Sequence, residues 1–136
     1  MIKRAALVIV LKEGKILSVS RGLGSPLWAL PGGKAEQDET PSQNAHRELY
    51  EETGITAKKL VPIYDELVKG EGDKGVDFYS NCFFAEEWSG EPCHSNEGDL
   101  DWLTEEELTK TKAAFPAYNE NAMKVFKQKY PNIKVL

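Results

Sequence analysis

The chain has 136 residues, enough for one compact domain with its own core and too few for two ordinary ones. Its 40% hydrophobic and 29% charged residues are typical of soluble globular proteins, which argues against disordered or fibrous architectures. The net charge of −5 has the wrong sign for gripping a nucleic-acid polymer through a basic surface, so an anionic ligand would need local help, such as a metal ion.

Two strands are expected at the start of a single domain that spans residues 1–136. Residues 5–11 are rich in Val, Ile and Leu, and the Glu13-Gly14 turn leads into residues 15–20, so the pattern predicts a β-hairpin. The apolar run is well short of the roughly 20 residues that cross a bilayer, and no small-residue cleavage site follows it. We therefore expect a cytoplasmic protein without a membrane partner.

A glycine-rich region comes next. Residues 21–26 contain two glycines and a proline, which is typical of a loop. The apolar segment 27–30 then stops at Pro31-Gly32-Gly33, where two glycines let the backbone approach a ligand closely.

A well-delimited helix follows this region. Thr40 and Gln43 have the spacing of a capping box, and Pro41 is favoured in a first helical turn. Gly54 is a helix stop after Thr53. The sequence therefore predicts a helix over residues 41–53.

The second half predicts alternating strands and short helices. Expected strands cover residues 59–68, 76–88 and 100–103, with a turn at 89–92. Thr104 and Glu107 predict a short capped helix, and a last helix is indicated by helical spacing of Tyr118, Ala122, Val125 and Phe126. The expected fold class is mixed α and β.

Three glutamates share one face of the helix over residues 41–53. Glu48, Glu51 and Glu52 stand at i, i+3 and i+4, within an arc of about 100°. Like charges at these spacings oppose helix formation, and only Arg47 could partly offset that. A solvated acidic face is one interpretation. A Mg²⁺ site is the other, because Mg²⁺ prefers oxygen ligands and joins a few carboxylates to substrate phosphates.

The spacing from Gly33 to Ile55 decides between these interpretations. Gly33 is followed by five residues and Glu39, then by seven residues and Arg47-Glu48-Leu49, then by Glu51-Glu52 and Gly54-Ile55. This pattern resembles the Nudix box in every fixed position, with nine specified positions over 23 residues. The resemblance extends to segments 28–33 and 88–92, which are similar to MutT-like members.

The resemblance implies a fold and a metal site. The implied fold is an α/β/α sandwich around a mixed β-sheet, with Ala45 and Leu49 as the buried stripe of the glutamate helix. The implied metal is Mg²⁺, with Mn²⁺ as a substitute. The implied ligands are the Gly32 carbonyl, Glu51 and Glu52.

Other box residues receive roles by the same resemblance. Glu48 would bind metal or orient water as a base, and Arg47 would hold a glutamate by ion pairing. Glu39 would have a supporting role, at the helix terminus or in an outer metal shell. Gly54 is expected to be structural, as a helix cap.

The last expected helix carries a candidate for base recognition. Residues 115–120, Phe-Pro-Ala-Tyr-Asn-Glu, resemble the FP-x-x-NE segment of MutT-like nucleoside triphosphate pyrophosphohydrolases, in which the Asn reads a purine edge. Asn119 is therefore a base-reading candidate, and an ordinary helix N-cap is the alternative. Residues 72–77 contain no arginine, which counts against selectivity for an oxidised guanine.

Four further residues are candidates for substrate contact. Arg21 is expected to contact phosphate, Trp28 or Phe78 to stack on a base, and Gly33 to line the approach. For Arg21 and the two aromatic residues, ordinary packing or surface exposure is the alternative. The substrate would be a small nucleotide, and the sequence leaves open whether the protein is a monomer or a homodimer.

One acidic residue outside the box is also a candidate. Glu97 lies in Glu97-Gly98-Asp99-Leu100-Asp101-Trp102, which resembles a later E-G…W stretch of the family whose glutamate reaches the helix from a loop. Glu97 would be a metal ligand or the general base, with Asp99 and Asp101 as bystanders. A solvated loop glutamate is the alternative.

The expected reaction is Mg²⁺-dependent hydrolysis of a nucleoside triphosphate, 8-oxo-dGTP or another dNTP included, to a nucleoside monophosphate and pyrophosphate. The alternatives are an ADP-ribose or nucleotide-sugar pyrophosphatase and a non-catalytic nucleotide sensor. ADP-ribose-specific members tend to carry a proline about fifteen residues past the box. Here Pro62 lies seven past Ile55, and the next proline is Pro92, which favours the triphosphate.

Overall fold

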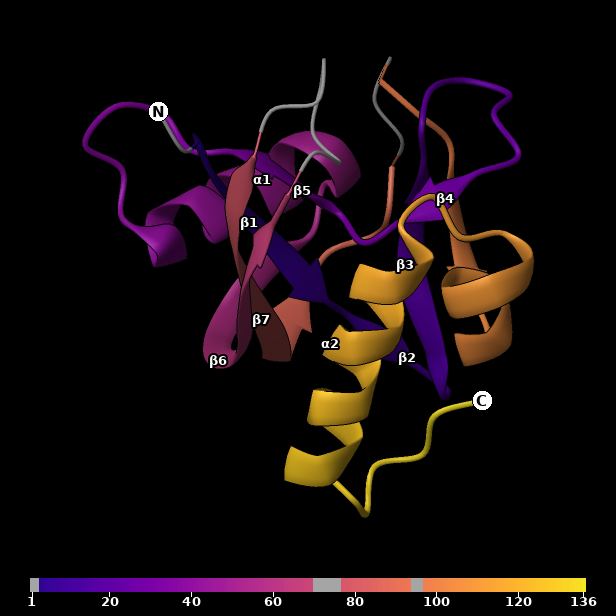
Figure 1. The fold of residues 1–136 in the computed structure, drawn as a ribbon. Helices are drawn as coiled ribbons and strands as arrows, with labels where there is room; N and C mark the ends of the chain where they lie inside the picture. The colour runs from indigo at the N-terminus through magenta and orange to yellow at the C-terminus, as the bar shows by residue number, and fades with distance from the viewer. Residues whose placement is uncertain (1–2, 70–76, 94–96) are drawn as a thin grey trace.

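The computed structural model describes residues 3–69, 77–93 and 97–136, whose strands form two sheets (Figure 1). The first sheet has the order β5-β1-β7-β6. β1 pairs in parallel with β7 and antiparallel with β5, while β6 and β7 are antiparallel, so this sheet is mixed. Its strands are β1 (Lys3–Ile9), β5 (Gly32–Lys34), β6 (Thr56–Val68) and β7 (Phe78–Ser89).

The second sheet is built around β3 (Lys15–Ser20) and is antiparallel. β3 pairs with β2 (Leu11–Lys12), with β4 (Trp28–Ala29) and with β8 (Leu100–Leu103). The second sheet therefore joins the start of the chain to a strand that lies some eighty residues later.

The hairpin predicted for the first two strands is only partly present. β1 ends at Ile9 and pairs with β5 and β7, so it belongs to the first sheet. Only Leu11–Lys12 folds back on β3, across the turn at Glu13 and Gly14, whose φ angles are 53° and 83°. Positive φ at both positions is the geometry of a tight hairpin turn. The prediction was wrong for residues 5–9. A strand that is buried on both faces is typical of a sheet interior, and β1 accordingly pairs with β5 and β7 rather than with the next strand along the chain.

Two longer helices and a short one complete the fold. α1 (Pro41–Thr53) and α2 (Pro116–Lys129) agree with the predicted helices, and Leu100–Leu103 forms the predicted short strand. The capped helix expected near Thr104 is present, because Thr104 and Glu107 exchange hydrogen bonds, and it continues as the π-helix η2 (Glu107–Thr111). The predicted start of β7 at residue 76 lies outside the described residues.

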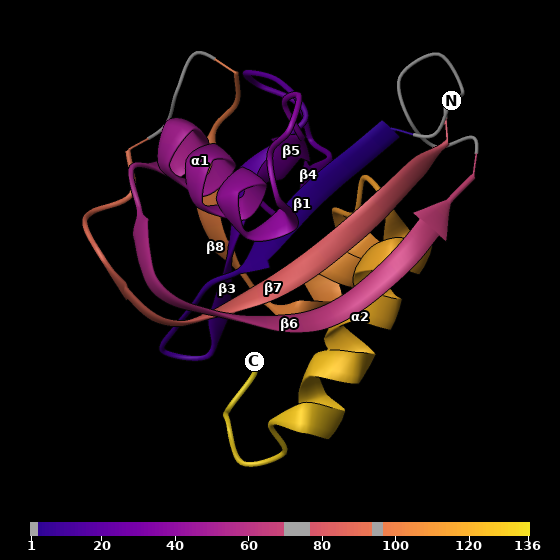
Figure 2. The ribbon, with the colours of Figure 1, turned by 90° about the vertical axis from the view of Figure 1, so that its left-hand side faces the viewer.

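The helices cover opposite faces of the first sheet (Figure 2). Successive side chains of a strand point to opposite faces. Ala6 and Val8 of β1 accordingly pack in the cluster that contains Ala45 and Leu49 of α1, whereas Ile9 packs in the cluster beside α2. The alternation builds two cores on one sheet, and the expected α/β/α sandwich around a mixed sheet is confirmed.

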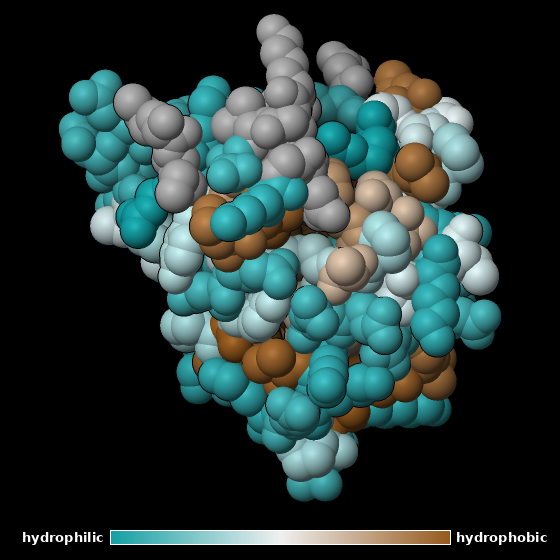
Figure 3. Space-filling model, viewed as in Figure 1, coloured by the Kyte–Doolittle hydropathy of each residue, from teal (hydrophilic) through white to brown (hydrophobic). Residues whose placement is uncertain are grey.

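The surface is consistent with this layered core. The face seen in Figure 3 is mostly polar, with apolar side chains gathered in small areas between polar ones. No helix of the described residues is long and apolar enough to span a membrane.

Candidate active site

The acidic face of α1 is fixed by both ends of the helix. The Thr40 side chain accepts a hydrogen bond from the Gln43 N–H, and the Gln43 side chain accepts one from the Thr40 N–H, so the predicted capping box is present. Gly54 ends the helix in the left-handed region, at φ 76°, as expected of a cap. Ala45 and Leu49 are fully buried, which sets the rotation of α1 and aims its glutamates away from the core.

Arg47 connects three of the glutamates. Its Nε and Nη2 donate to the two oxygens of Glu39 at 2.7 and 3.0 Å. Its Nη1 donates to Glu48 Oε1 at 2.7 Å and to Glu51 Oε2 at 3.0 Å. Nη2 also donates to the Lys34 carbonyl oxygen at 3.0 Å, which ties α1 to β5. The ion pair expected for Arg47 is therefore present, with Glu39 as its two-bond partner.

The glycine pair brings the backbone against these carboxylates. The Gly32 N–H donates to Glu52 Oε1 at 2.6 Å. A Cβ on Gly32 would collide with the Ala6 carbonyl oxygen, and a Cβ on Gly33 would collide with the Glu48 carboxylate. Close approach to the backbone of β1 thus requires glycine at residue 32, whereas a side chain at residue 33 would displace the Glu48 carboxylate.

The carboxylates differ in how strongly they hold a proton. Burial raises the pKa of Glu52 to about 7; the Gly32 N–H opposes this shift, and the charges of Glu48 and Glu97 add to it. Burial also raises the pKa of Glu48, against the lowering effect of Arg47. The pKa of Glu39 is lowered, chiefly by its hydrogen bonds from Arg47. The site therefore contains carboxylates that lack enough positive charge around them.

The donor set suits a hard divalent cation. Carboxylate oxygens are the ligands that Mg²⁺ prefers, and the charge of Glu97 raises the pKa of both Glu48 and Glu52. Within the described residues, however, no three acidic, His or Cys side chains are gathered as a ready metal cluster. Arg47 holds Glu48 and Glu51, and Glu52 holds the Gly32 amide rather than facing a common centre. The ligand roles of Gly32, Glu48, Glu51, Glu52 and Glu97 stay predictions.

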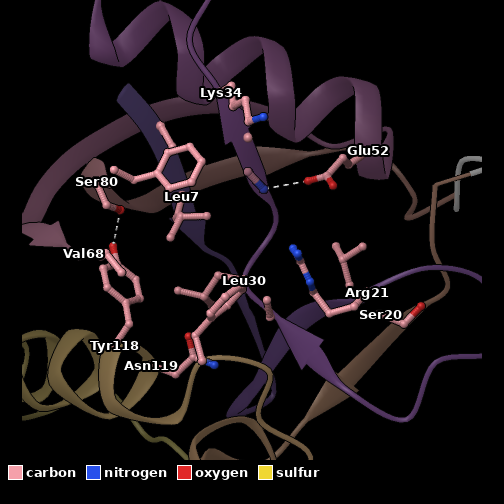
Figure 4. A pocket seen from close by; sticks show the side chains of 17 residues that line it. Leu7, Ser20, Arg21, Leu30, Lys34, Glu52, Val68, Ser80, Tyr118 and Asn119 are labelled. Atoms are coloured by element: carbon pink, nitrogen blue, oxygen red, sulfur yellow. Dashed lines mark hydrogen bonds between the residues drawn. The ribbon is translucent and has the colours of Figure 1, made fainter. Parts of the chain in front are cut away.

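A cavity of about 210 Å³ opens beside Glu52, between the two sheets and the start of α2 (Figure 4). Apolar side chains such as Leu7, Leu30 and Val68 form much of its wall. Its polar groups come from separate elements, and they include Arg21, Lys34, Ser80 and Asn119. Apolar walls with a few placed polar groups are typical of small-molecule sites.

The predicted substrate residues divide into those that line this cavity and one that does not. Arg21, Gly33, Phe78 and Asn119 line it. Trp28 is not among the lining residues; its ring packs, partly buried, against the core beside α2, so the packing alternative fits it better than stacking on a base. Its backbone N–H donates to the Lys112 carbonyl at 2.7 Å, and its carbonyl accepts from Ala114 N–H at 2.8 Å.

Arg21 lies between the acidic and aromatic parts of the site. Its guanidinium stacks over the Phe115 ring at 4.9 Å, and its charge lowers the pKa of Glu52. Figure 4 shows Arg21 between Glu52 and Leu30. A cation in this position can meet an anionic group that is bound next to the glutamates.

Asn119 is not a helix N-cap, which corrects the alternative reading of this residue. α2 begins at Pro116 after Phe115, so Asn119 is one turn inside the helix. Its side chain is buried, donates to the Leu108 carbonyl at 2.9 Å and lines the cavity. Orienting the amide in this way fixes which of its atoms faces a ligand.

Sequence reasoning missed the contacts of several residues in or beside the cavity. Ser80 and Tyr118 join their hydroxyl groups at 2.7 Å inside the cavity wall, and both are buried. Asn44, also buried, donates to the Gly33 carbonyl at 3.2 Å and so supports the glycine turn. Phe115 stood in the recognised FP-x-x-NE segment, but only a structure pairs it with Arg21, 94 residues away in the printed sequence.

Glu97 is exposed on the loop before β8, and its charge raises the pKa of both Glu48 and Glu52. Glu97 therefore acts on the α1 carboxylates electrostatically. Its role as ligand or base stays a prediction. Most of the segment in which an arginine was sought, residues 72–77, lies outside the described residues.

Comparisons with known proteins point in one direction. The NUDIX domain family matches residues 1–124. The chain is 34% identical over 103 residues to the oxidized purine nucleoside triphosphate hydrolase of Danio rerio, covering 74% of this chain and 65% of that protein. It is 39% identical over 85 residues to the ADP-ribose pyrophosphatase of Bacillus subtilis, covering 60% of this chain and 40% of that protein.

The solved structures agree with the sequence relatives. The MutT protein from Bacillus halodurans superposes with a TM-score of 0.71 at 27% identity, over 90% of this chain and 80% of that one. The chain spans about two thirds or less of the length of the curated relatives that it matches first.

Proposed function

The chain belongs to the Nudix family, and from this premise we propose that it hydrolyses a phosphoanhydride bond in a nucleoside triphosphate with the help of Mg²⁺. The observation that carries the proposal is the position of the half-buried Glu52, which lies on the wall of a cavity that Arg21 and Asn119 also line. Acidic side chains beside an apolar recess with a few polar groups suit both halves of such a substrate, its phosphates and its base.

The bound cation would neutralise the phosphates and lower the pKa of the attacking water. Glu48, Glu51 and Glu52 would hold it, and the Gly32 carbonyl would complete the protein ligands. Arg47 keeps the carboxylates ordered through its bonds to Glu48 and Glu51, so its share is orientation. Either Glu48 or Glu97 would accept the proton of the water; burial and the charges of Glu51 and Glu97 raise the pKa of Glu48, which favours its protonation.

The cavity supplies the recognition of the substrate. Phe78 and Phe115 offer aromatic surface for a base, and the buried amide of Asn119 offers hydrogen bonds to a base edge. Arg21 would meet the phosphates on the side that faces Glu52. The products would be a nucleoside monophosphate and pyrophosphate.

ADP-ribose is the second candidate substrate, because one matched relative is named an ADP-ribose pyrophosphatase. The triphosphate is preferred because ADP-ribose-specific members of the family tend to carry a proline about fifteen residues past the box, whereas here Pro62 lies seven past Ile55 and the next proline is Pro92.

The test is a product-resolved screen of normal and oxidised nucleoside triphosphates, ADP-ribose and dinucleoside polyphosphates with Mg²⁺. We expect a triphosphate to give the highest kcat/KM, with pyrophosphate as the inorganic product. If ADP-ribose gave the highest kcat/KM, the proposed substrate would be wrong, whereas the proposed hydrolysis of a phosphoanhydride bond would stand. Nucleotide binding without turnover of any compound would contradict the hydrolase and support a sensor.

A further inference from the structure

The end of β3 and the start of β8 are joined more tightly than their strand pairing requires. Ser20 N–H donates to the Asp99 carbonyl at 2.9 Å, and Asp99 N–H donates to the Ser20 hydroxyl oxygen at 2.8 Å. The Ser20 hydroxyl in turn donates to the Gly22 carbonyl at 2.7 Å. Both peptide groups of this pair are thereby satisfied next to the cavity, whose wall includes Ser20.

The Asp99 side chain extends this junction to a second loop. Its Oδ2 accepts a hydrogen bond from Gly24 N–H at 2.9 Å, across 75 residues of sequence. Gly24 belongs to the loop over residues 21–27, which Arg21 closes through its N–H to the Leu27 carbonyl at 2.9 Å. Asp99 therefore restrains the loop that carries Arg21.

Gly98 shows how closely the two segments approach. It is buried, and a Cβ at this position would lie 2.5 Å from the Ser20 carbonyl oxygen and 3.1 Å from Val19 Cγ1. A side chain at residue 98 would thus push the Glu97 loop away from β3. The contact holds the residue that follows Glu97 in one place.

Two residues of opposite charge stand beside this junction, and both act electrostatically on the Glu52 carboxylate. Glu97 precedes Gly98 and raises the pKa of Glu52, whereas Arg21 follows Ser20 and lowers it. Their distances to Glu52 depend on the same set of hydrogen bonds, because each stands within two residues of Ser20 or Asp99.

We propose that Ser20 and Asp99 form a latch that holds Glu97 and the loop over residues 21–27 in fixed positions around the glutamate site, which makes Asp99 a positioning residue for the reaction. The proposal rests on the proposed hydrolase function. It assigns to Asp99 a hydrogen-bonding role, in which its charge is not required, rather than the part of a bystander or a metal ligand.

The first test compares Asp99→Ala, Asp99→Asn and the matched control Asp101→Ala by kcat and KM. Asn keeps an oxygen that can accept from Gly24 N–H. We expect Asp99→Ala to lower kcat at least tenfold, Asp99→Asn to stay within about threefold of wild type, and Asp101→Ala to be unchanged. Equal losses in Asp99→Asn and Asp99→Ala would overturn the latch, since the charge would then matter, as in a metal ligand. A fully active Asp99→Ala enzyme would overturn it as well.

The second test asks whether Asp99 acts through Glu97. In a double-mutant cycle, Asp99→Ala should lower kcat much less in a Glu97→Gln background than in wild type, because coupled residues are not additive. Independent, multiplying effects would contradict the coupling, and so would a Glu97→Gln enzyme with normal kcat.

Hydrogen exchange separates this proposal from the hydrolase itself. The Gly24 amide should lose protection in Asp99→Ala and keep it in Asp99→Asn and Asp101→Ala, whether or not any nucleotide is hydrolysed. Unchanged Gly24 exchange in Asp99→Ala would remove the latch while leaving the proposed reaction intact. Protection of the Gly24 amide in a wild-type protein that hydrolyses no nucleotide would instead contradict the proposed reaction and leave the latch intact.

Discussion

Glu52 differs from the other glutamates of α1 because it is the one that lines the cavity. Its carboxylate accepts a hydrogen bond from the Gly32 N–H. Glu51 lies one position earlier, and its side chain is 57% exposed. The two are adjacent in sequence, but burial gives them different electrostatic surroundings. The consequences can be measured one residue at a time.

The substitutions Glu51→Gln and Glu52→Gln should each lower kcat by at least about a hundredfold, because each removes charge stabilisation that acts in the transition state. The fold should persist, since Gln preserves the shape of either side chain. Steady-state kinetics and circular dichroism provide the measurement. Exposed Glu87 is a suitable control, and a near-normal rate in both box variants would return the solvated acidic face as the better interpretation.

Glu52 should also make the metal-free protein less stable as the pH rises. Its pKa is 4.5 as a free side chain and about 7 in the folded protein, so the folded state holds the proton more tightly. The resulting stabilisation is present below pH 4.5 and is lost as the pH rises through 7. At about 1.4 kcal/mol per pKa unit, the loss is at most about 3.5 kcal/mol.

Urea unfolding in excess chelator at pH 5 and pH 8 measures this effect. Wild type should lose stability relative to Glu52→Gln between the two values, because the variant has no proton to release at residue 52. A constant difference between the two proteins across this pH range would show that Glu52 titrates normally.

At the scale of elements, Arg47 joins α1 to β5 and to the turn that carries Glu39. Its five hydrogen bonds run to three carboxylates and one carbonyl, and its side chain is only 22% exposed. The planar fork of a guanidinium makes this set of bonds possible, whereas the ammonium group of Lys has three donors around one point.

Arg47→Lys should therefore destabilise the protein by about 1–3 kcal/mol, the range for hydrogen bonds to charged groups that lose a partner. It should also lower kcat, because Glu48 and Glu51 would lose their orientation. Chemical denaturation and kinetics test both effects. Lys59→Ala breaks the exposed pair with Glu86 and serves as the control, with little change expected. An Arg47→Lys protein as stable and active as wild type would contradict the role of the fork.

The elements also show where sequence reasoning stops. Thr40, Gln43 and Gly54 delimit α1 correctly because caps depend on residues that lie within one turn of each other. The partner of β1 could not be predicted in this way, since it is set by the burial of both faces and by residues 78–89. The same limit applies to the bond between Asp99 and Gly24, and to the contact between Arg21 and Phe115, which join distant segments.

Trp28 and Asn119 illustrate the limit at the site. Aromatic and amide side chains are suited both to packing and to ligand binding, so their type alone does not distinguish the two roles. The cavity wall distinguishes them, because Asn119 lines it and Trp28 does not. The box, by contrast, required only residue types at fixed spacing along the chain.

At the scale of the whole molecule, a net charge of −5 with acidic residues concentrated at one site should make stability depend on divalent cations. Millimolar Mg²⁺ should raise Tm at pH 8, and excess chelator should abolish both this rise and turnover. Calorimetry with NaCl at matched ionic strength controls for screening. The rise should vanish when Glu48, Glu51 and Glu52 are all Gln, and full turnover in chelator would refute a metal requirement.

The order of strands in the two sheets has a consequence for synthesis. β1 pairs with β7, and β3 pairs with β8. Each of these early strands therefore has a partner that is synthesised many residues later. A nascent chain that already contains the whole glutamate helix would still expose the unpaired edges of β1 and β3. We therefore expect both sheets to be completed only after residue 103 has been added, and a fragment that ends near residue 60 should aggregate rather than form a small, active Nudix core.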